Sequence, residues 1–206
     1  MKFLFRPLIC FSLFLCYATL NAQQFQGGIF AGINTSQITG DDLGGYDKIG
    51  ISAGFLGRRK FNERWAFHME IGYLGKGSRT NLSLRDTFLG FYRLQLHYIE
   101  VPLLATFKIK PFLEIETGPS LGVIFGWREE DIYGELKGPF ASVKNFKPYD
   151  LSWAYGGTFW FKEKWGINIR ALSSIFSVRN HDQNAHYRLN RGQYSSCIMG
   201  RIIHIF

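Results

Sequence analysis

The chain has 206 residues, of which 46% are hydrophobic, 17% aromatic and 19% charged, with 24 Lys or Arg against 16 Asp or Glu. This apolar content excludes an intrinsically disordered chain. A mean hydropathy of −0.06, without a long apolar run beyond the N-terminal region, excludes a bundle of membrane helices. The many aromatic and Gly residues favour short strands joined by tight bends.

Residues 1–22 have the pattern of a secretory signal peptide. Lys2 and Arg6 give the segment a positive start, and the apolar stretch that follows ends near Ala22, where we expect cleavage. This predicts two parts, a signal peptide over 1–22 and one outer-membrane β-barrel domain over 23–206.

Cleavage would lower the formal net charge from +8 by two units and leave Cys197 as the only cysteine. One cysteine forms no internal disulfide, so an exported chain of this kind needs another source of stability, and a closed barrel in lipid provides one. Nucleic acid is not an expected partner, because the chain is exported and contains no run of Lys or Arg.

Alternation of apolar and polar residues with a period of two predicts eight strands in the mature chain. Each is close to the length of about 9 to 11 residues that a tilted strand needs to cross a bilayer. The segments are 24–35, 48–60, 65–76, 92–108, 112–127, 150–161, 165–178 and 194–206. In the third, Trp65, Met69 and Ile71 alternate with polar or small residues.

The connections between these segments alternate in length. Short ones lie at 61–64, 110–111 and 162–164, and long polar ones lie at 36–47, 77–91, 128–149 and 179–193. This pattern predicts an all-β fold, an eight-stranded antiparallel up-and-down transmembrane β-barrel. The location expected is the cell outer membrane, with several passes, external long loops and both termini in the periplasm.

The direction of the apolar face separates this barrel from two alternatives. A soluble lipocalin-like barrel hides its apolar face around a ligand, and a soluble sandwich uses it as a core. Here bulky aromatic residues gather near strand ends, as in the girdles at membrane interfaces, which favours an apolar face turned to lipid. They are Trp65, Phe112, Trp127, Trp153, Phe161, Trp165 and Phe206.

If the apolar faces point outward, the polar residues of the same strands point into a lumen that eight strands leave only wide enough for side chains. Unpaired charges there are costly, so we expect carboxylates and guanidiniums to pair and fill it. The predicted lumen ion network is Glu70, Glu100, Glu114, Glu116, Arg170 and Arg201. The catalytic alternative is a general acid and base formed by Glu114 and Glu116.

The fourth segment changes its phase. Its apolar residues occupy even positions up to Tyr98 and odd positions from Ile99, and a bulge in this strand would insert the extra residue. The polar residues expected to line the upper lumen are then Arg93, Gln95 and His97.

Several stretches resemble a known family. They are the Gly-rich 27–32, the turn at 39–42, Lys48-Ile49-Gly50 and above all 96–104, Leu-His-Tyr-Ile-Glu-Val-Pro-Leu-Leu. Together they resemble the PorT-like outer-membrane β-barrel family of Bacteroidota, over essentially the whole mature chain. The resemblance implies an outer-membrane barrel of a Gram-negative cell and, for most relatives, no defined activity. The family's namesake takes part in type IX protein secretion, which makes an accessory role in secretion one expectation.

The external loops offer further candidate sites. Guanidiniums there would contact lipopolysaccharide phosphates, and the candidates are Arg79, Arg85, Arg179, Arg188 and Arg191. Imidazole and carboxylate groups also occur together at His181, Asp182 and His186, but without the spacing of a metal site. No metal and no cofactor are therefore expected.

Three classes of function remain open. The first, which we favour, is a non-enzymatic structural or interaction protein of the cell envelope with a charge-plugged lumen, in contact with lipid and with an envelope protein partner through its loops. The second is a narrow channel or small-solute transporter. The third is a membrane-embedded hydrolase or acyltransferase, for which Ser195 and Ser196 lie near His181 and Asp182 in sequence.

Overall fold

The computed structural model describes residues 25–40, 44–80, 91–131, 133–135, 145–180 and 192–206. The strands of this part are β1 Phe25–Thr39, β2 Lys48–Lys60, β3 Trp65–Arg79, β4 Arg93–Lys110, β5 Leu113–Asp131, β6 Gly134–Glu135, β7 Tyr149–Lys162, β8 Trp165–Ser174 and β9 Tyr194–Ile205. Over the same residues, no helix has the length and apolar character needed to cross a membrane.

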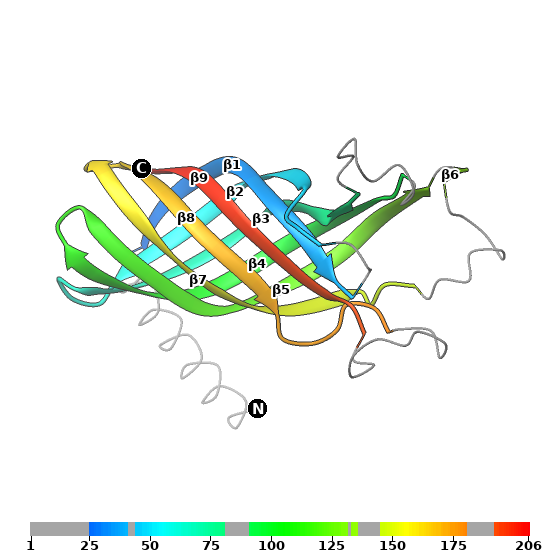
Figure 1. Cartoon of the computed structure of the whole chain (residues 1–206). Coiled ribbons are helices and arrows are strands. Elements are labelled where there is room, and N and C mark those ends of the chain that lie inside the picture. Colours follow the sequence, from blue (N-terminus) through cyan, green and yellow to red (C-terminus); the bar gives the residue numbers. More distant parts are fainter. Residues whose placement is uncertain (1–24, 41–43, 81–90, 132, 136–144, 181–191) are drawn as a thin grey trace, which may run out of the picture.

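Eight of these strands close into an antiparallel barrel (Figure 1). Consecutive strands pair with each other, and the ring closes where β1 pairs with β9, with Gly28 opposite Ile205 and Thr39 opposite Tyr194. The two-residue β6 only pairs with the far end of β5, and β5 pairs with β7 in the ring. The predicted eight-stranded up-and-down barrel is confirmed.

The two ends of the barrel differ. The turn end carries the short connections at 61–64, 111–112 and 163–164 together with the start of β1 and the C-terminus (Figure 1). The loop end carries the opposite ends of the same strands. The alternation of connection lengths in the sequence therefore corresponds to the two ends of one ring.

Three strands run further toward the loop end than the sequence predicted. β1 continues to Thr39, β3 to Arg79 and β5 to Asp131, through residues expected to lie in loops. Most of these added residues are polar, but their backbones still pair across the sheet, and the alternation of apolar residues does not record that pairing. By contrast, β8 ends at Ser174, before the expected position 178.

The outer surface of the barrel is apolar. Ile71, near the middle of β3, is 54% exposed. Each of the other seven strands of the ring also carries exposed large apolar side chains on its outward-facing positions. Polar residues of the opposite alternation are buried inside, such as Glu70 beside Ile71. This is the reverse of a soluble lipocalin-like barrel, and a continuous outer apolar face is what a lipid environment requires.

The aromatic residues predicted to form interface girdles are all exposed. Five of them, Trp65, Phe112, Phe161, Trp165 and Phe206, lie at the turn end. Ring contacts join neighbouring strands here, for example between Trp165 and His204, whose ring centroids are 4.2 Å apart. Trp127 and Trp153 lie toward the loop end of β5 and β7.

The predicted phase of the fourth strand is wrong. β4 keeps one alternation over its whole length, and Leu94, Leu96 and Tyr98 are buried inside the barrel. The outward positions of this half are Arg93, Gln95 and His97, which therefore do not line the lumen. His97 instead makes a hydrogen bond on the outer side, with Nδ1 2.7 Å from the Tyr73 hydroxyl.

The register between β4 and β5 does shift at the predicted place, but the extra residue lies on β5. His97 pairs with Gly126 while Tyr98 pairs with Ile124, so Phe125 has no partner on β4. A bulge of this kind changes the phase of the strand that contains it. On β5 the inward residues accordingly have even numbers up to Ile124, whereas beyond the bulge the inward residue is the odd-numbered Glu129.

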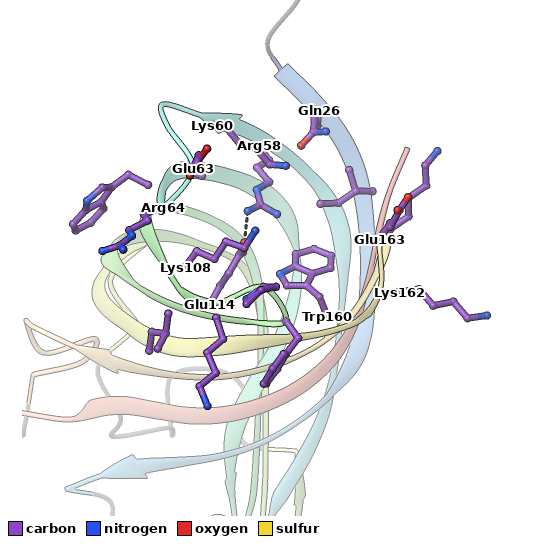
Figure 2. Close-up of a pocket in the computed structure, with 18 of the residues that line it drawn as sticks. Gln26, Arg58, Lys60, Glu63, Arg64, Lys108, Glu114, Trp160, Lys162 and Glu163 are labelled. Carbon is purple, nitrogen blue, oxygen red and sulfur yellow. Dashed lines mark hydrogen bonds and ion pairs between the residues drawn. The ribbon is translucent and has the colours of Figure 1, made fainter.

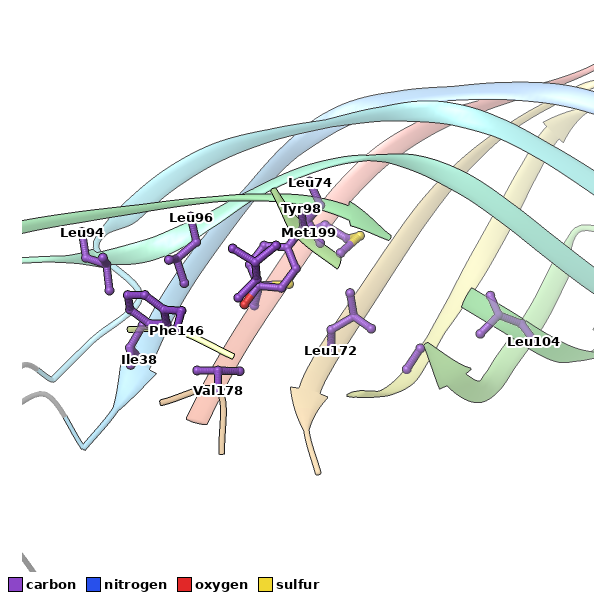
Figure 3. Close-up of a cluster of buried hydrophobic side chains, with 13 residues drawn as sticks. Ile38, Leu74, Leu94, Leu96, Tyr98, Leu104, Phe146, Leu172, Val178 and Met199 are labelled. Carbon is purple, nitrogen blue, oxygen red and sulfur yellow. The ribbon is translucent and has the colours of Figure 1, made fainter. Parts of the chain in front are cut away.

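The buried side chains toward the loop end are apolar (Figure 3). We call this set the inner apolar cluster, and its residues are Ile38, Leu74, Leu94, Leu96, Tyr98, Leu104, Ile124, Phe146, Ala154, Leu172, Val178, Cys197 and Met199. Phe146 and Val178 come from segments outside the ring strands and pack against Ile38 and Leu96 at this end (Figure 3). The sequence had predicted a polar interior throughout. The inner apolar cluster shows that the loop-end part of the interior is apolar.

Candidate functional site

The middle of the barrel holds a buried ion network centred on Glu70 of β3. Arg170 of β8 binds this carboxylate with two parallel hydrogen bonds, each 2.8 Å long. Arg201 of β9 adds a third, with Nη1 2.8 Å from Glu70 Oε2. All three side chains are almost fully buried, so the paired geometry offsets a desolvation cost that single charges could not bear.

Two more side chains complete this central network. Arg170 Nε donates to Glu116 of β5 at 2.7 Å. Asn168 connects the two guanidiniums, because its Nδ2 donates to Glu116 at 2.8 Å and its Oδ1 accepts from Arg201 Nη2 at 2.7 Å. Four strands, β3, β5, β8 and β9, are therefore joined across the lumen.

Glycines make room for the two arginines. Gly156 pairs with Arg170, and a Cβ on this glycine would lie 2.8 Å from the arginine Cα. Gly32 pairs with Arg201, where an added Cβ would lie 2.6 Å from the Cα. The Arg201 guanidinium also lies 4.5 Å from the centre of the Phe30 ring. Without these small residues the stems would not fit an eight-stranded interior.

A second group of charges lies on the loop-end side of the first. Lys76 Nζ is 3.4 Å from Glu100 and 3.4 Å from Asp150, and it lies 4.3 Å from the centre of the Tyr98 ring. Ser120 donates to Glu100 at 2.7 Å. One cation is shared by two carboxylates here, which is the reverse of the stoichiometry around Glu70.

A third pair lies toward the turn end. Arg58 of β2 is paired with Glu114 of β5 across the interior, and its guanidinium lies 5.3 Å from the centre of the Trp160 ring. Beyond this pair, an open cavity leads to the outside at the turn end.

The loop end has its own buried pair. Arg179 Nη2 is 2.7 Å from Glu129 Oε2, and the Tyr92 hydroxyl also donates to Glu129. The Arg179 guanidinium lies 4.0 Å from the centre of the Phe146 ring. This pair joins the segment after β8 to the far end of β5 and covers the inner apolar cluster.

All six residues predicted for the lumen ion network are buried in the barrel, but they form three groups and not one. Glu70, Glu116, Arg170 and Arg201 lie together. Glu100 belongs to the Lys76 group, and Glu114 pairs with Arg58. Because Glu114 and Glu116 each bind a different cation, the two carboxylates are not arranged around a shared substrate position.

Arg58, Lys76 and Asp150 were not among the lumen residues predicted from the sequence. Each stands in a predicted strand on the same alternation as an inward residue, for example Lys76 with Glu70 on β3. The alternation of inward and outward residues along the predicted strands was therefore sufficient to find them. The charges inside the described part of the chain are balanced, with Lys48, Arg58, Lys76, Arg170, Arg179 and Arg201 against Glu70, Glu100, Glu114, Glu116, Glu129 and Asp150.

The other predicted site residues are divided between described and undescribed parts. Arg79 is exposed at the loop end of β3, whereas Arg179 is buried against Glu129. Arg85, Arg188 and Arg191 lie outside the described residues, as do His181, Asp182 and His186 and the proposed signal at 1–22. Ser195 and Ser196 belong to β9. Among the described residues, no three His, Cys, Asp or Glu side chains are placed to hold a metal ion.

A closed antiparallel ring with an apolar outer face and an ionic interior defines an integral outer-membrane β-barrel protein. The chain belongs to the family described as outer membrane protein beta-barrel domain, whose model matches residues 18–180. No curated protein matches the chain.

Two of the solved structures that match this chain show the similarity of the fold. One is Ail, the attachment invasion locus protein of Yersinia pestis, which is 13% identical, with coverage of 89% of this chain and 99% of that chain and a TM-score of 0.51. The other is Neisserial surface protein A, which is 11% identical, with coverage of 89% and 97% and a TM-score of 0.51. At these identities the likeness concerns the fold.

Proposed function

We propose that this protein is a non-enzymatic outer-membrane barrel with a plugged lumen that acts as a structural or interaction protein of the cell envelope. The observation that carries the proposal is the filling of the interior along its axis. Three ionic groups around Glu114, Glu70 and Lys76 are followed by the inner apolar cluster. A solute would have to break buried ion pairs and then cross an apolar layer, and both steps are costly.

The free space in the interior supports a closed lumen. Between the Glu70 and Glu100 groups there is a void of only about 20 Å³, bordered by Phe30, Leu172 and Met199. A void of this size holds about one water molecule. The larger cavity at the turn end stops at Arg58 and Trp160.

We expect the purified protein to show no discrete conductance steps in planar bilayers, because several independent layers close the lumen. Arg170→Ala should also stay silent, since the Lys76 group and the inner apolar cluster remain above it. A porin reconstituted in the same membrane serves as the positive control. Regular steps from the wild-type protein would instead support the alternative function, a narrow channel.

The orientation follows from the same proposal. The turn end, with both termini, faces the periplasm, and the loop end faces outward, as is usual for barrels with one set of short turns. Accessibility of a tag after Phe206 in intact and in permeabilised cells tests this: labelling only after permeabilisation is expected.

Lipopolysaccharide is the proposed partner at the outer rim. Arg79 and Arg93 are direct cross-strand partners on the outer face at the loop end, where the sequence analysis had counted only Arg79. Like charges placed opposite each other on a sheet repel, and here Glu130, opposite Arg93 on β5, offsets only part of this charge. A lipid phosphate bound by both guanidiniums would satisfy this geometry. Arg179 is not included, because Glu129 already binds it.

Replacing Arg79 and Arg93 by Gln should lower the amount of lipopolysaccharide that co-purifies with the barrel. The matched control replaces Arg59 and Lys162 by Gln, which removes the same charge at the turn end. Equal lipopolysaccharide content in both double variants would count against the site.

An accessory role in secretion and a PorT-like identity remain part of the proposal. In the stretch 96–104 that carries the resemblance, Tyr98, Glu100 and Leu104 face inward, and Glu100 is held by Lys76 and Ser120. These residues build the interior, whereas Ile99 and Leu103 of the same stretch are exposed on the outer face. Comparing the secreted proteins of deletion and wild-type cells tests the role, which predicts a loss of secreted proteins in the deletion.

A further inference from the structure

The mouth of the barrel at the turn end is a wide, open cavity. Its volume is about 1070 Å³, and its wall is formed by the ends of the strands and by the three short turns (Figure 2). We call it the turn-end cup. None of the layers described above needs it, because the plug is complete beyond its floor.

The wall of the cup is strongly basic. Seven Lys or Arg side chains line it against three Glu side chains. Lys60, Lys108 and Lys110 come from the ends of β2 and β4, on one side of the mouth. Within the cup, Glu114 is already paired with Arg58, which leaves six cationic side chains against Glu63 and Glu163. A concave surface of one sign concentrates ligands of the opposite charge.

The floor of the cup carries donors without a partner. Arg58 is only 7% exposed, and its Nε has no hydrogen-bond partner among the described residues. The indole Nε1 of Trp160 beside it also lacks one, as does the acceptor Oε2 of Glu114. Figure 2 shows the Arg58 guanidinium between Glu114 and Trp160 inside the mouth. Buried donors of this kind are costly unless something accepts their hydrogen bonds.

The cup also has apolar walls. Pro111, Phe112 and Ile205 line it together with the Trp160 ring. An occupant is therefore expected to combine negative charge with apolar groups. Because the strands surround the cavity, an occupant enters from the aqueous side and stops at Arg58.

We propose that the turn-end cup binds an acidic peptide segment of another envelope protein. Carboxylates of the segment would pair with Lys60, Lys108 and Lys110 at the rim, and its apolar side chains would contact Phe112 and Ile205. The volume accommodates several residues, which is more than an inorganic anion requires. The assignment rests on the proposed function only in that the turn end faces the periplasm; binding by the purified barrel is independent of that orientation and of the plug.

The test measures binding of a fluorescent peptide of alternating Glu and Leu to the purified full-length mature barrel in nanodiscs of zwitterionic lipid. The variant carries Lys60→Gln, Lys108→Gln and Lys110→Gln, all at the rim. The control carries Arg79→Gln, Arg128→Gln and Lys147→Gln, which removes the same charge at the loop end. Heat-dependent gel mobility shows that each variant is folded.

We expect the wild-type protein and the loop-end control to bind the acidic peptide equally, and the rim variant to bind about tenfold more weakly, since each exposed ion pair contributes little. A peptide with Gln in place of Glu should not bind measurably. Equal binding by the rim variant, or equal binding of the Gln peptide, would overturn the proposal. Displacement of the peptide by an equal concentration of inorganic phosphate, or loss of binding when the nanodisc contains anionic lipid, would assign the cup to a small anion or to the lipid surface and would also overturn it.

Discussion

Glu70→Gln is expected to destabilise the barrel by about 3 to 5 kcal/mol, the cost of removing one partner from a buried ion pair. The substitution keeps the size of the side chain but removes the charge that Arg170 and Arg201 share. Two guanidiniums would then face each other in the interior with only Glu116 left to balance them. The midpoint of urea unfolding in lipid vesicles, followed by tryptophan fluorescence, measures the effect.

Glu130→Gln is the matched control for this experiment. Glu130 pairs with Arg128, whose side chain is more than half exposed, and exposed pairs of this kind contribute about 0 to 1 kcal/mol. A loss of stability for Glu70→Gln no larger than that of the control would contradict the central role assigned to the Glu70 network.

Ile71→Arg is expected to cost about 2 to 4 kcal/mol, as found for a cation on the lipid face near the middle of the bilayer. Ile71 is next to Glu70 in sequence, yet its side chain lies on the opposite face of β3 and is exposed. The same unfolding measurement applies, and the expected result is a lower midpoint in urea.

The control for the lipid face is Glu63→Arg, in the exposed turn between β2 and β3. Water solvates a cation at this exposed position, so the free energy of unfolding of Glu63→Arg should stay within about 0.5 kcal/mol of the wild-type value. If Ile71→Arg were tolerated as well as Glu63→Arg, the outer face of the barrel would not be in contact with lipid.

Much of this fold can be predicted from the sequence. Alternation of residues such as those around Ile71 reports which positions share a face, and the lengths of the connections report the order of the strands around the ring. Both signals are local, and neither depends on packing. The ends of β1, β3 and β5 were predicted less well, because polar residues continue a strand without changing the apolar pattern.

The fourth strand shows where such prediction fails. On β4 both alternations are apolar in part, and the sequence analysis assigned Leu94, Leu96 and Tyr98 to lipid because it assumed a polar interior. In the structure they lie inside the barrel, in one cluster with Phe146 and Val178, which come from distant segments. A periodic pattern cannot report contacts of this kind.

The grouping of the charges was also beyond the sequence. Glu100 and Glu116 share a predicted inward direction, but their positions along the barrel axis depend on the register between strands. That register places Glu116 beside Arg170 and Glu100 beside Lys76. The direction of each side chain predicts which residues lie inside the barrel, whereas the register between strands determines which of them form ion pairs.

The central ion pairs join distant parts of the chain: Arg170 and Arg201 follow their shared partner Glu70 by 100 and 131 residues. The first bond needs β8, and the second needs β9, the strand whose pairing with β1 closes the ring. A nascent molecule halted before β9 pairs would leave Glu70 with Arg170 alone beside an open seam. Insertion should therefore proceed as a single concerted event, and copies lacking their final dozen residues should be degraded and not accumulate as seven-stranded sheets.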